Sequence, residues 1–177
     1  SREGNVITAE GLIREVIERA SVKNEDPLIA EQVALGAIKY MILRQAAGGD
    51  IIFDMDKSLS LEGDSGPYLQ YALVRATSIL TSATVTPSDT PSCTEATLLA
   101  QLLIRFPEIV SRAESLHAPH ILTTYLTQLA SEWNSYYATG KIIGSEDEAQ
   151  KLALVRAFAN TMRSGLHLLA IPTPERM

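Results

Sequence analysis

The sequence predicts an all-α fold, a helical bundle with short connections. Apolar residues recur at helical spacing along most of its 177 residues. Proline and capping signals stand where such stretches begin, and glycines stand where they end. The one extended candidate, Ile51–Phe53, is too short to predict a strand. A bundle therefore accounts for nearly the whole chain.

Two helices are expected in the first third of the chain. Thr8 is a plausible N-cap for a helix over residues 9–20, whose apolar side chains recur every three or four positions. Asp26-Pro27 opens a second helix that runs to about Gln45, and Gly48-Gly49 ends it.

From Gly66 onward every element is expected to be helical. A Ser/Thr/Pro-rich loop is expected over residues 84–91. Ser92-x-x-Glu95 and Ser145-x-x-Glu148 match the capping-box pattern, and Pro107 is expected to break or kink a helix. The expected helices span residues 67–83, 92–105, 107–116, 119–138 and 145–170.

Composition indicates a folded chain with a substantial core. Hydrophobic residues make up 46% of the sequence, and no apolar run approaches the roughly 20 residues of a membrane span. Cys93 is the single cysteine, which excludes an internal disulfide framework and fits a reducing, cytoplasmic location. We read it as a small buried or cap-adjacent hydrophobe rather than a nucleophile.

A face of the helix after Pro67 carries two tyrosines and an arginine. Tyr68, Tyr71 and Arg75 stand at i, i+3 and i+7, so their side chains project side by side. Such a stripe commonly packs into a core with its hydroxyls at the rim. The functional alternative is a surface that stacks on the splayed bases of unpaired RNA.

Several motifs resemble those of arginyl-tRNA synthetases, in the same order along the chain. Residues 58–75, with Gly-Pro-Tyr-Leu-Gln-Tyr at their centre, resemble the signature that opens the anticodon-binding domain of this family. Four matches in order are hard to obtain by chance. The other three are residues 1–8, similar to the tail of a Lys-Met-Ser-Lys-type loop, Trp133–Tyr137, and Leu152–Arg156 of the Asp-Ala-Leu-Arg ("DALR") type. The ending at 165–177 also resembles the C-terminus of the family.

The resemblance implies a carboxy-terminal fragment of such an enzyme. Residues 1–62 would form a connector following the catalytic core, and residues 63–177 a DALR-type anticodon-binding domain. The parent would attach arginine to tRNA(Arg) with ATP and Mg, while arginine and ATP would bind the missing core. Ser1 and Arg2 match the tail of the ATP loop, without its leading lysine. The fragment alone would need no cofactor and would be inactive.

The resemblance also implies the anticodon-binding residues, which are Tyr68, Tyr71, Arg75, Tyr137 and Met177. The rings would stack on loop bases, the guanidinium would bind a phosphate or base edge, and the main chain of the last residue would help read the middle base. Trp133 and Tyr136 are expected to support the core. For Asn134 two roles stay open, namely orienting the loop and capping a neighbouring turn.

The net charge opposes RNA binding, because the chain has 15 Lys and Arg residues but 21 Asp and Glu residues. The net charge of −6 divides into −4 up to Glu62 and −2 beyond it, so binding would depend on stacking and a few cations. Those cations are Arg75, Lys141, Arg156, Arg163 and Arg176. Neither a metal site nor a membrane or DNA partner is expected, although His117 and His120 form a His-x-x-His pair.

Two alternatives stay open. One is the anticodon-binding domain of another class I synthetase, such as the cysteinyl enzyme. The other is a helical protein-interaction domain without an RNA partner, which would bury the tyrosine stripe.

Overall fold

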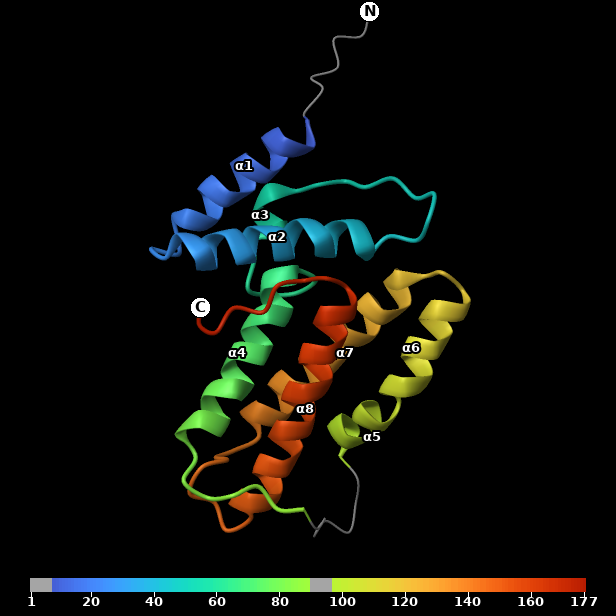
Figure 1. The fold of residues 1–177 in the computed structure, drawn as a ribbon. Helices are drawn as coiled ribbons and strands as arrows, with labels where there is room; N and C mark the ends of the chain where they lie inside the picture. Colours follow the sequence, from blue (N-terminus) through green and yellow to red (C-terminus); the bar gives the residue numbers. More distant parts are fainter. Residues whose placement is uncertain (1–7, 90–96) are drawn as a thin grey trace, which may run out of the picture.

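The computed structural model describes residues 8–89 and 97–177. In these ranges the chain forms only helices, with no strand, which confirms the all-α prediction (Figure 1). The helices are α1 (Ala9–Ser21), α2 (Pro27–Leu43), α3 (Met55–Ser58), α4 (Gly66–Ser82), α5 (Leu98–Ile104), α6 (Phe106–Ser115), α7 (Pro119–Ala138) and α8 (Glu148–Leu168).

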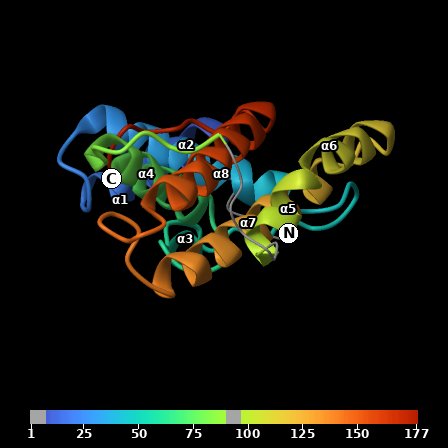
Figure 2. The same cartoon turned by 90° about the horizontal axis from the view of Figure 1, so that it is seen from below.

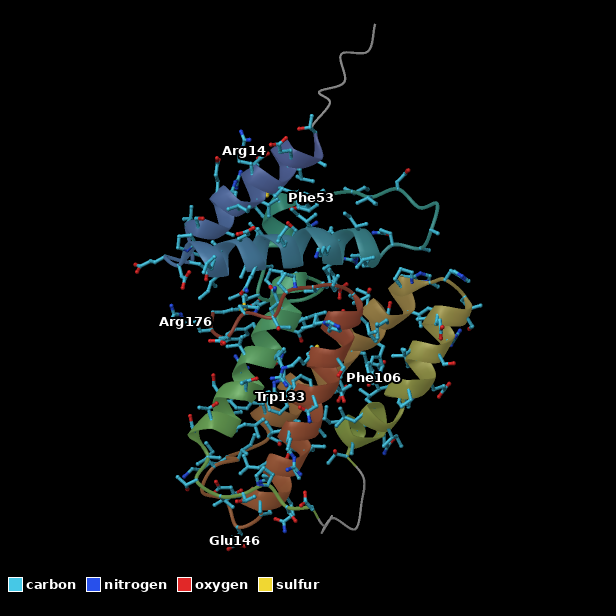
Figure 3. The ribbon with its side chains drawn as sticks, in the orientation of Figure 1. Arg14, Phe53, Phe106, Trp133, Glu146 and Arg176 are labelled. Carbon is cyan, nitrogen blue, oxygen red and sulfur yellow. The ribbon has the colours of Figure 1, made fainter. Side chains whose placement is uncertain are left out.

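Helices α4, α7 and α8 form the centre of the bundle, with α5 and α6 beside α7 (Figures 1 and 2). Trp133 lies in the interior of this bundle (Figure 3), where it is fully buried and stacks on Phe158 with ring centroids 4.6 Å apart. Burying these large aromatic rings supplies much of the apolar area that holds α7 against α8. The same core contains Leu69, Leu126, Leu129, Leu152, Val155, Met162 and Leu166.

Helices α1 and α2 cross one end of the bundle and have a core of their own (Figure 1). Both begin as predicted. The Thr8 hydroxyl accepts a hydrogen bond from the Gly11 N–H at 3.1 Å, and the Asp26 carboxylate accepts from Leu28 N–H at 3.0 Å. Each cap satisfies an N–H that the helix itself leaves without a partner.

The crossing of α2 over α4 brings two backbones into direct contact. Gly66 lies against the carbonyl of Gly36, where a Cβ atom would have no room. One turn along α4, the fully buried Gln70 side chain donates to the carbonyls of Gln32 at 3.0 Å and Pro172 at 2.7 Å. Gln70 therefore joins α4 to α2 and to the last segment of the chain.

Most helix boundaries agree with the predictions. Helix α7 spans the predicted residues 119–138, and α2 ends two residues before the expected Gln45. Pro107 lies in the first turn of α6, and the helix is interrupted between α5 and α6 as expected. The described part of the predicted loop, residues 84–89, contains no helix.

Neither predicted capping box marks the start of its helix. Ser92 and Glu95 lie outside the described residues, but Thr97 is not helical and caps α5 by accepting from Ala100 N–H at 3.2 Å, so the predicted start was too early. The second box is wrong. The Ser145 hydroxyl donates to the Ile142 carbonyl at 2.8 Å, and α8 begins only at Glu148. The single turn α3 was not predicted.

Candidate nucleic-acid interface

The first turns of α4 carry Tyr68, Tyr71 and Arg75. The helix begins here because Ser65 caps it, its hydroxyl accepting from Tyr68 N–H at 3.1 Å and donating to the carbonyl of Ser60. Pro67 presets the backbone of the first turn. The cap thus fixes the position of Tyr68 at the start of the helix.

Helix α7 brings Asn134 and Tyr137 to the same place. The Tyr137 ring lies 6.0 Å from the ring of Trp133, one turn back on the helix, and Trp133 is anchored on Phe158. The buried rings of Trp133 and Phe158 therefore support the exposed Tyr137 ring.

The guanidinium of Arg75 lies between two aromatic rings. Its central carbon is 4.6 Å from the centroid of Tyr71 and 5.0 Å from that of Tyr137, distances at which a cation is attracted to a ring face. One amino group also donates to the Tyr71 hydroxyl at 2.8 Å. Arg75 therefore joins the tyrosines of α4 and α7.

Asn134 completes the group. Its amide N–H donates to the Tyr68 hydroxyl at 2.9 Å, and its carbonyl oxygen accepts from Arg75 at 3.4 Å. We call these five residues, Tyr68, Tyr71, Arg75, Asn134 and Tyr137, the aromatic cluster. Sequence reasoning left the role of Asn134 open, and it had no signal for a contact that spans 66 residues of chain.

The aromatic cluster is partly open to solvent. Tyr137 is 41% exposed, and Tyr68, Tyr71 and Arg75 are half-buried. Trp133, by contrast, is fully buried, and Tyr136 is half-buried against the main core, as expected for supporting residues. The cluster is therefore partly exposed at the surface, while Trp133 joins it to the core.

Met177 lies in a different cluster from the tyrosines. It packs against the smaller core of α1 and α2, in a pocket lined also by Val33, Leu59 and Leu61. The structure thus brings four of the five predicted anticodon-binding residues together and places the fifth elsewhere. Ser1 and Arg2, the predicted tail of the ATP loop, lie outside the described residues.

The other predicted cations are distributed over the surface, and two are paired. Arg156 lies 2.8 Å from Asp89, and Arg176 lies 2.9 Å from Asp26. The Leu28 N–H, and then Arg176, hold the pKa of Asp26 below its usual value. Arg176 is at the edge of the molecule beside α2 (Figure 3), while Lys141 and Arg163 are exposed.

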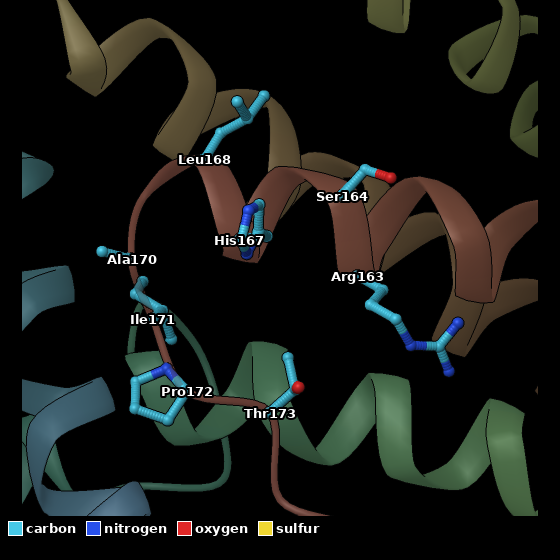
Figure 4. Close-up of a pocket in the computed structure, with 8 residues that line it drawn as sticks. All are labelled: Arg163, Ser164, His167, Leu168, Ala170, Ile171, Pro172 and Thr173. Atoms are coloured by element: carbon cyan, nitrogen blue, oxygen red, sulfur yellow. The ribbon is translucent and has the colours of Figure 1, made fainter.

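A groove of about 750 Å³ lies between α8 and the chain segment that follows it (Figure 4). Arg163, Ser164 and His167 line it from α8, and Thr173 faces them from the last segment. Sequence reasoning missed this groove, because it exists only where the chain folds back after α8.

The described part of the chain holds no group of three or more His, Cys, Asp or Glu side chains placed to bind a metal. His117 is exposed at the end of α6, and His120 lies in the first turn of α7. None of the helices within residues 8–89 and 97–177 combines the length and apolarity needed to cross a bilayer.

Comparisons with known proteins agree with the resemblance seen in the motifs. The model of the DALR anticodon binding domain matches residues 69–177. Arginine–tRNA ligases of Flavobacterium psychrophilum and Streptococcus thermophilus are 33% and 35% identical to the whole chain. The chain spans only about a third of their length, 32% and 34%.

Solved structures give the same result. Arginyl-tRNA synthetase of Thermus thermophilus matches 98% of the chain, with 34% identity and a TM-score of 0.87, over 33% of its own length. Arginyl-tRNA synthetase of Plasmodium falciparum matches 97% of this chain and 34% of its own length, with a TM-score of 0.84. At 24% identity, this match supports the fold alone. These matches favour the arginyl family over the cysteinyl and protein-interaction alternatives. The chain therefore belongs to the family of DALR anticodon-binding domains and is homologous to part of the arginine–tRNA ligases.

Proposed function

We propose that this chain binds the anticodon loop of tRNA(Arg) as part of an arginine–tRNA ligase. The observation that carries the proposal is the aromatic cluster, in which three tyrosines and an arginine from two helices meet at the surface. Aromatic rings stack on any unstacked base, and unpaired loops are where RNA presents such bases. Family membership supplies the class of RNA.

The members of the cluster have different roles in this proposal. Tyr68, Tyr71 and Tyr137 stack on loop bases and supply affinity. Arg75 places a positive charge between two of the rings, close to where phosphates would pass. Met177, in the smaller core, would read the middle anticodon base through its main chain and terminal carboxylate, at a second contact region.

The parent enzyme would attach arginine to tRNA(Arg) using ATP with Mg, in the cytoplasm. Arginine and ATP would bind a catalytic core outside this chain, and Ser1 and Arg2 would belong to the loop that approaches the ATP phosphates. The chain by itself would bind tRNA without aminoacylating it. No cofactor is needed for that binding.

Binding of labelled transcripts tests the proposal. The 177-residue chain is expected to bind an arginine-accepting tRNA more tightly than tRNAs that accept other amino acids. Changing the middle anticodon base of the arginine tRNA should remove that preference, because specificity depends on base edges. Equal binding of all transcripts, or binding of none, contradicts the proposal.

A further inference from the structure

We propose that Asn134 is a positioning residue of the aromatic cluster, which fixes Tyr68 and Arg75 so that the tyrosine hydroxyls face the RNA as hydrogen-bond donors. This inference rests on the proposed function and extends it. The inference is based on one amide side chain on α7 that contacts two members of the aromatic cluster on α4.

The chemistry of the amide suits this place. Asn134 donates to the Tyr68 hydroxyl at 2.9 Å and accepts from Arg75 at 3.4 Å. A carboxylate has no N–H for the phenol oxygen, and an aliphatic side chain has neither group. Asparagine therefore bonds both neighbours at once, and it does so from the helix turn that also carries Trp133 on the core.

The hydrogen bonds of the aromatic cluster determine whether the tyrosine hydroxyls are free to donate. A phenol has one O–H donor and accepts through its oxygen. The oxygen of Tyr68 accepts from Asn134, and the oxygen of Tyr71 accepts from Arg75 at 2.8 Å. Each hydroxyl proton is then left for a further acceptor. Carbonyl oxygens, ring nitrogens and phosphate oxygens of an RNA loop are such acceptors.

Positioning also lowers the entropic cost of binding. A tyrosine whose hydroxyl is bonded in the RNA-free protein has less rotational freedom to lose when a base stacks on it. Arg75, bonded to Asn134 and Tyr71 and flanked by two rings, is ordered in the same way. Loss of Asn134 should therefore weaken RNA binding even though Asn134 need not touch RNA.

A double-mutant cycle on the full chain with the arginine-accepting tRNA transcript tests this role. Tyr68→Phe removes only the hydroxyl, and Asn134→Leu removes both amide contacts at similar size. Each change is expected to weaken binding about threefold to tenfold, the equivalent of one hydrogen bond. Because both changes remove the Asn134–Tyr68 bond, their effects should be coupled, and the loss of affinity in the double variant should be smaller than the product of the two single losses. Ser135→Ala is the matched control, since that exposed hydroxyl donates to the Ser131 carbonyl within α7.

Three results would overturn the inference. Unchanged affinity of Asn134→Leu or Tyr68→Phe would do so, as would effects that multiply in the double variant. The third is a lowered thermal midpoint of Asn134→Leu with unchanged affinity of the folded protein, which indicates a merely structural residue. If leucine prevents folding, Asn134→Ala replaces it in the cycle. If the unaltered chain does not prefer the arginine tRNA, the proposed function itself fails.

Discussion

Neighbouring aromatic residues on α7 have different surroundings. Trp133 is fully buried and stacks on Phe158, whereas Tyr137, one turn later, is 41% exposed and flanks Arg75. A ring with its face against the core stabilises the fold, and a ring with an accessible face can also stack on a base. On this helix, Trp133 therefore supports the core, whereas Tyr137 is the ring proposed to contact RNA.

Tyr71→Ala should weaken binding of the arginine tRNA by about 1–3 kcal/mol, the usual value of one stacked base. The bundle should stay folded, because Tyr71 is half-buried and its hydroxyl contacts Arg75 at the surface of α4. Equilibrium binding and a thermal unfolding curve of the same sample check both parts. A large drop in the thermal midpoint with unchanged affinity would mean that Tyr71 belongs to the core.

The sequence predicts the members of the cluster on one helix but not the contacts between helices. Spacing alone places Tyr68, Tyr71 and Arg75 on one face of α4. The role of Asn134 depends on partners 59 and 66 residues away, which helical periodicity does not encode. Tyr137 and Met177 came from the family resemblance, and the anticodon-reading roles of all of these residues stay predictions.

At the scale of helices, the α2–α4 crossing requires a residue without a side chain. Gly66 faces the Gly36 carbonyl, and a Cβ at Gly36 would in turn meet the Gln70 side chain at 2.5 Å. The two helices approach so closely because both positions are glycine. This crossing joins the core of α1 and α2 to the main bundle.

Gly66→Ala is expected to destabilise the protein by about 1–3 kcal/mol, since the added methyl group forces the two backbones apart. The sign is informative, because alanine in place of a helical glycine otherwise stabilises by up to about 1 kcal/mol. Gly140→Ala is the control, since a Cβ there would meet nothing within 4 Å. Urea unfolding of the three proteins measures the difference, and equal stabilities would contradict the described crossing.

Tyr125 links α7 to α5 and makes this link sensitive to alkaline pH. Its hydroxyl donates to the Leu102 carbonyl at 3.0 Å, and burial raises the pKa of Tyr125 from 10.0 to about 12. A raised pKa means that the folded state holds the proton more tightly than the unfolded state. The stabilisation is therefore complete below pH 10 and is lost as the pH rises toward 12.

Tyr125→Phe tests this sign. At neutral pH the variant should be less stable by about 1 kcal/mol, because the Leu102 carbonyl loses its donor. Above pH 10 the unaltered protein loses its advantage while the variant has no phenol to ionise, so the difference should shrink. Urea unfolding of both proteins at several pH values measures it, and the titration of other groups, including Tyr40, cancels in the comparison. A difference that is constant with pH would contradict the assignment.

Helix starts were predictable where the residue before the helix bonds to an N–H of the first turn. Thr8 and Asp26 cap as expected, each accepting from such an N–H. Ser145 instead donates to Ile142, and Glu148 accepts from the Gly144 N–H at 2.7 Å, so a local turn replaces the expected capping box. The single turn α3 has four residues, so the apolar pattern has no room to repeat along it and periodicity cannot detect it.

At the scale of the whole molecule, α2 belongs to both cores. Val33 packs with α1, whereas Tyr40 and Met41 pack with the main bundle. The predicted boundary between residues 62 and 63 stays a prediction, and the matched anticodon-binding domain starts close to it, at residue 69. Contacts shared through one helix would fix the interface region relative to the connector.

The net charge of −6 predicts a shallow salt dependence for tRNA binding. Arg156 and Arg176 are paired with aspartates, so few cations remain to neutralise phosphates. With about three phosphate contacts on a single strand, the slope of log K against log salt should be about −2. Binding measured over a series of potassium chloride concentrations gives the slope. A value steeper than about −5 would mean that charge, rather than stacking, supplies the affinity.

Photo-cross-linking identifies the surface of this chain that contacts the anticodon loop. An arginine-accepting tRNA carrying 5-iodouridine in its anticodon loop would be irradiated with the chain, and the modified peptides identified by mass spectrometry. The cross-links are expected on Tyr68, Tyr71 or Tyr137, and they should disappear when unlabelled arginine tRNA competes. Cross-links confined to other surfaces, such as the groove between Arg163 and Thr173, would contradict the role of the aromatic cluster.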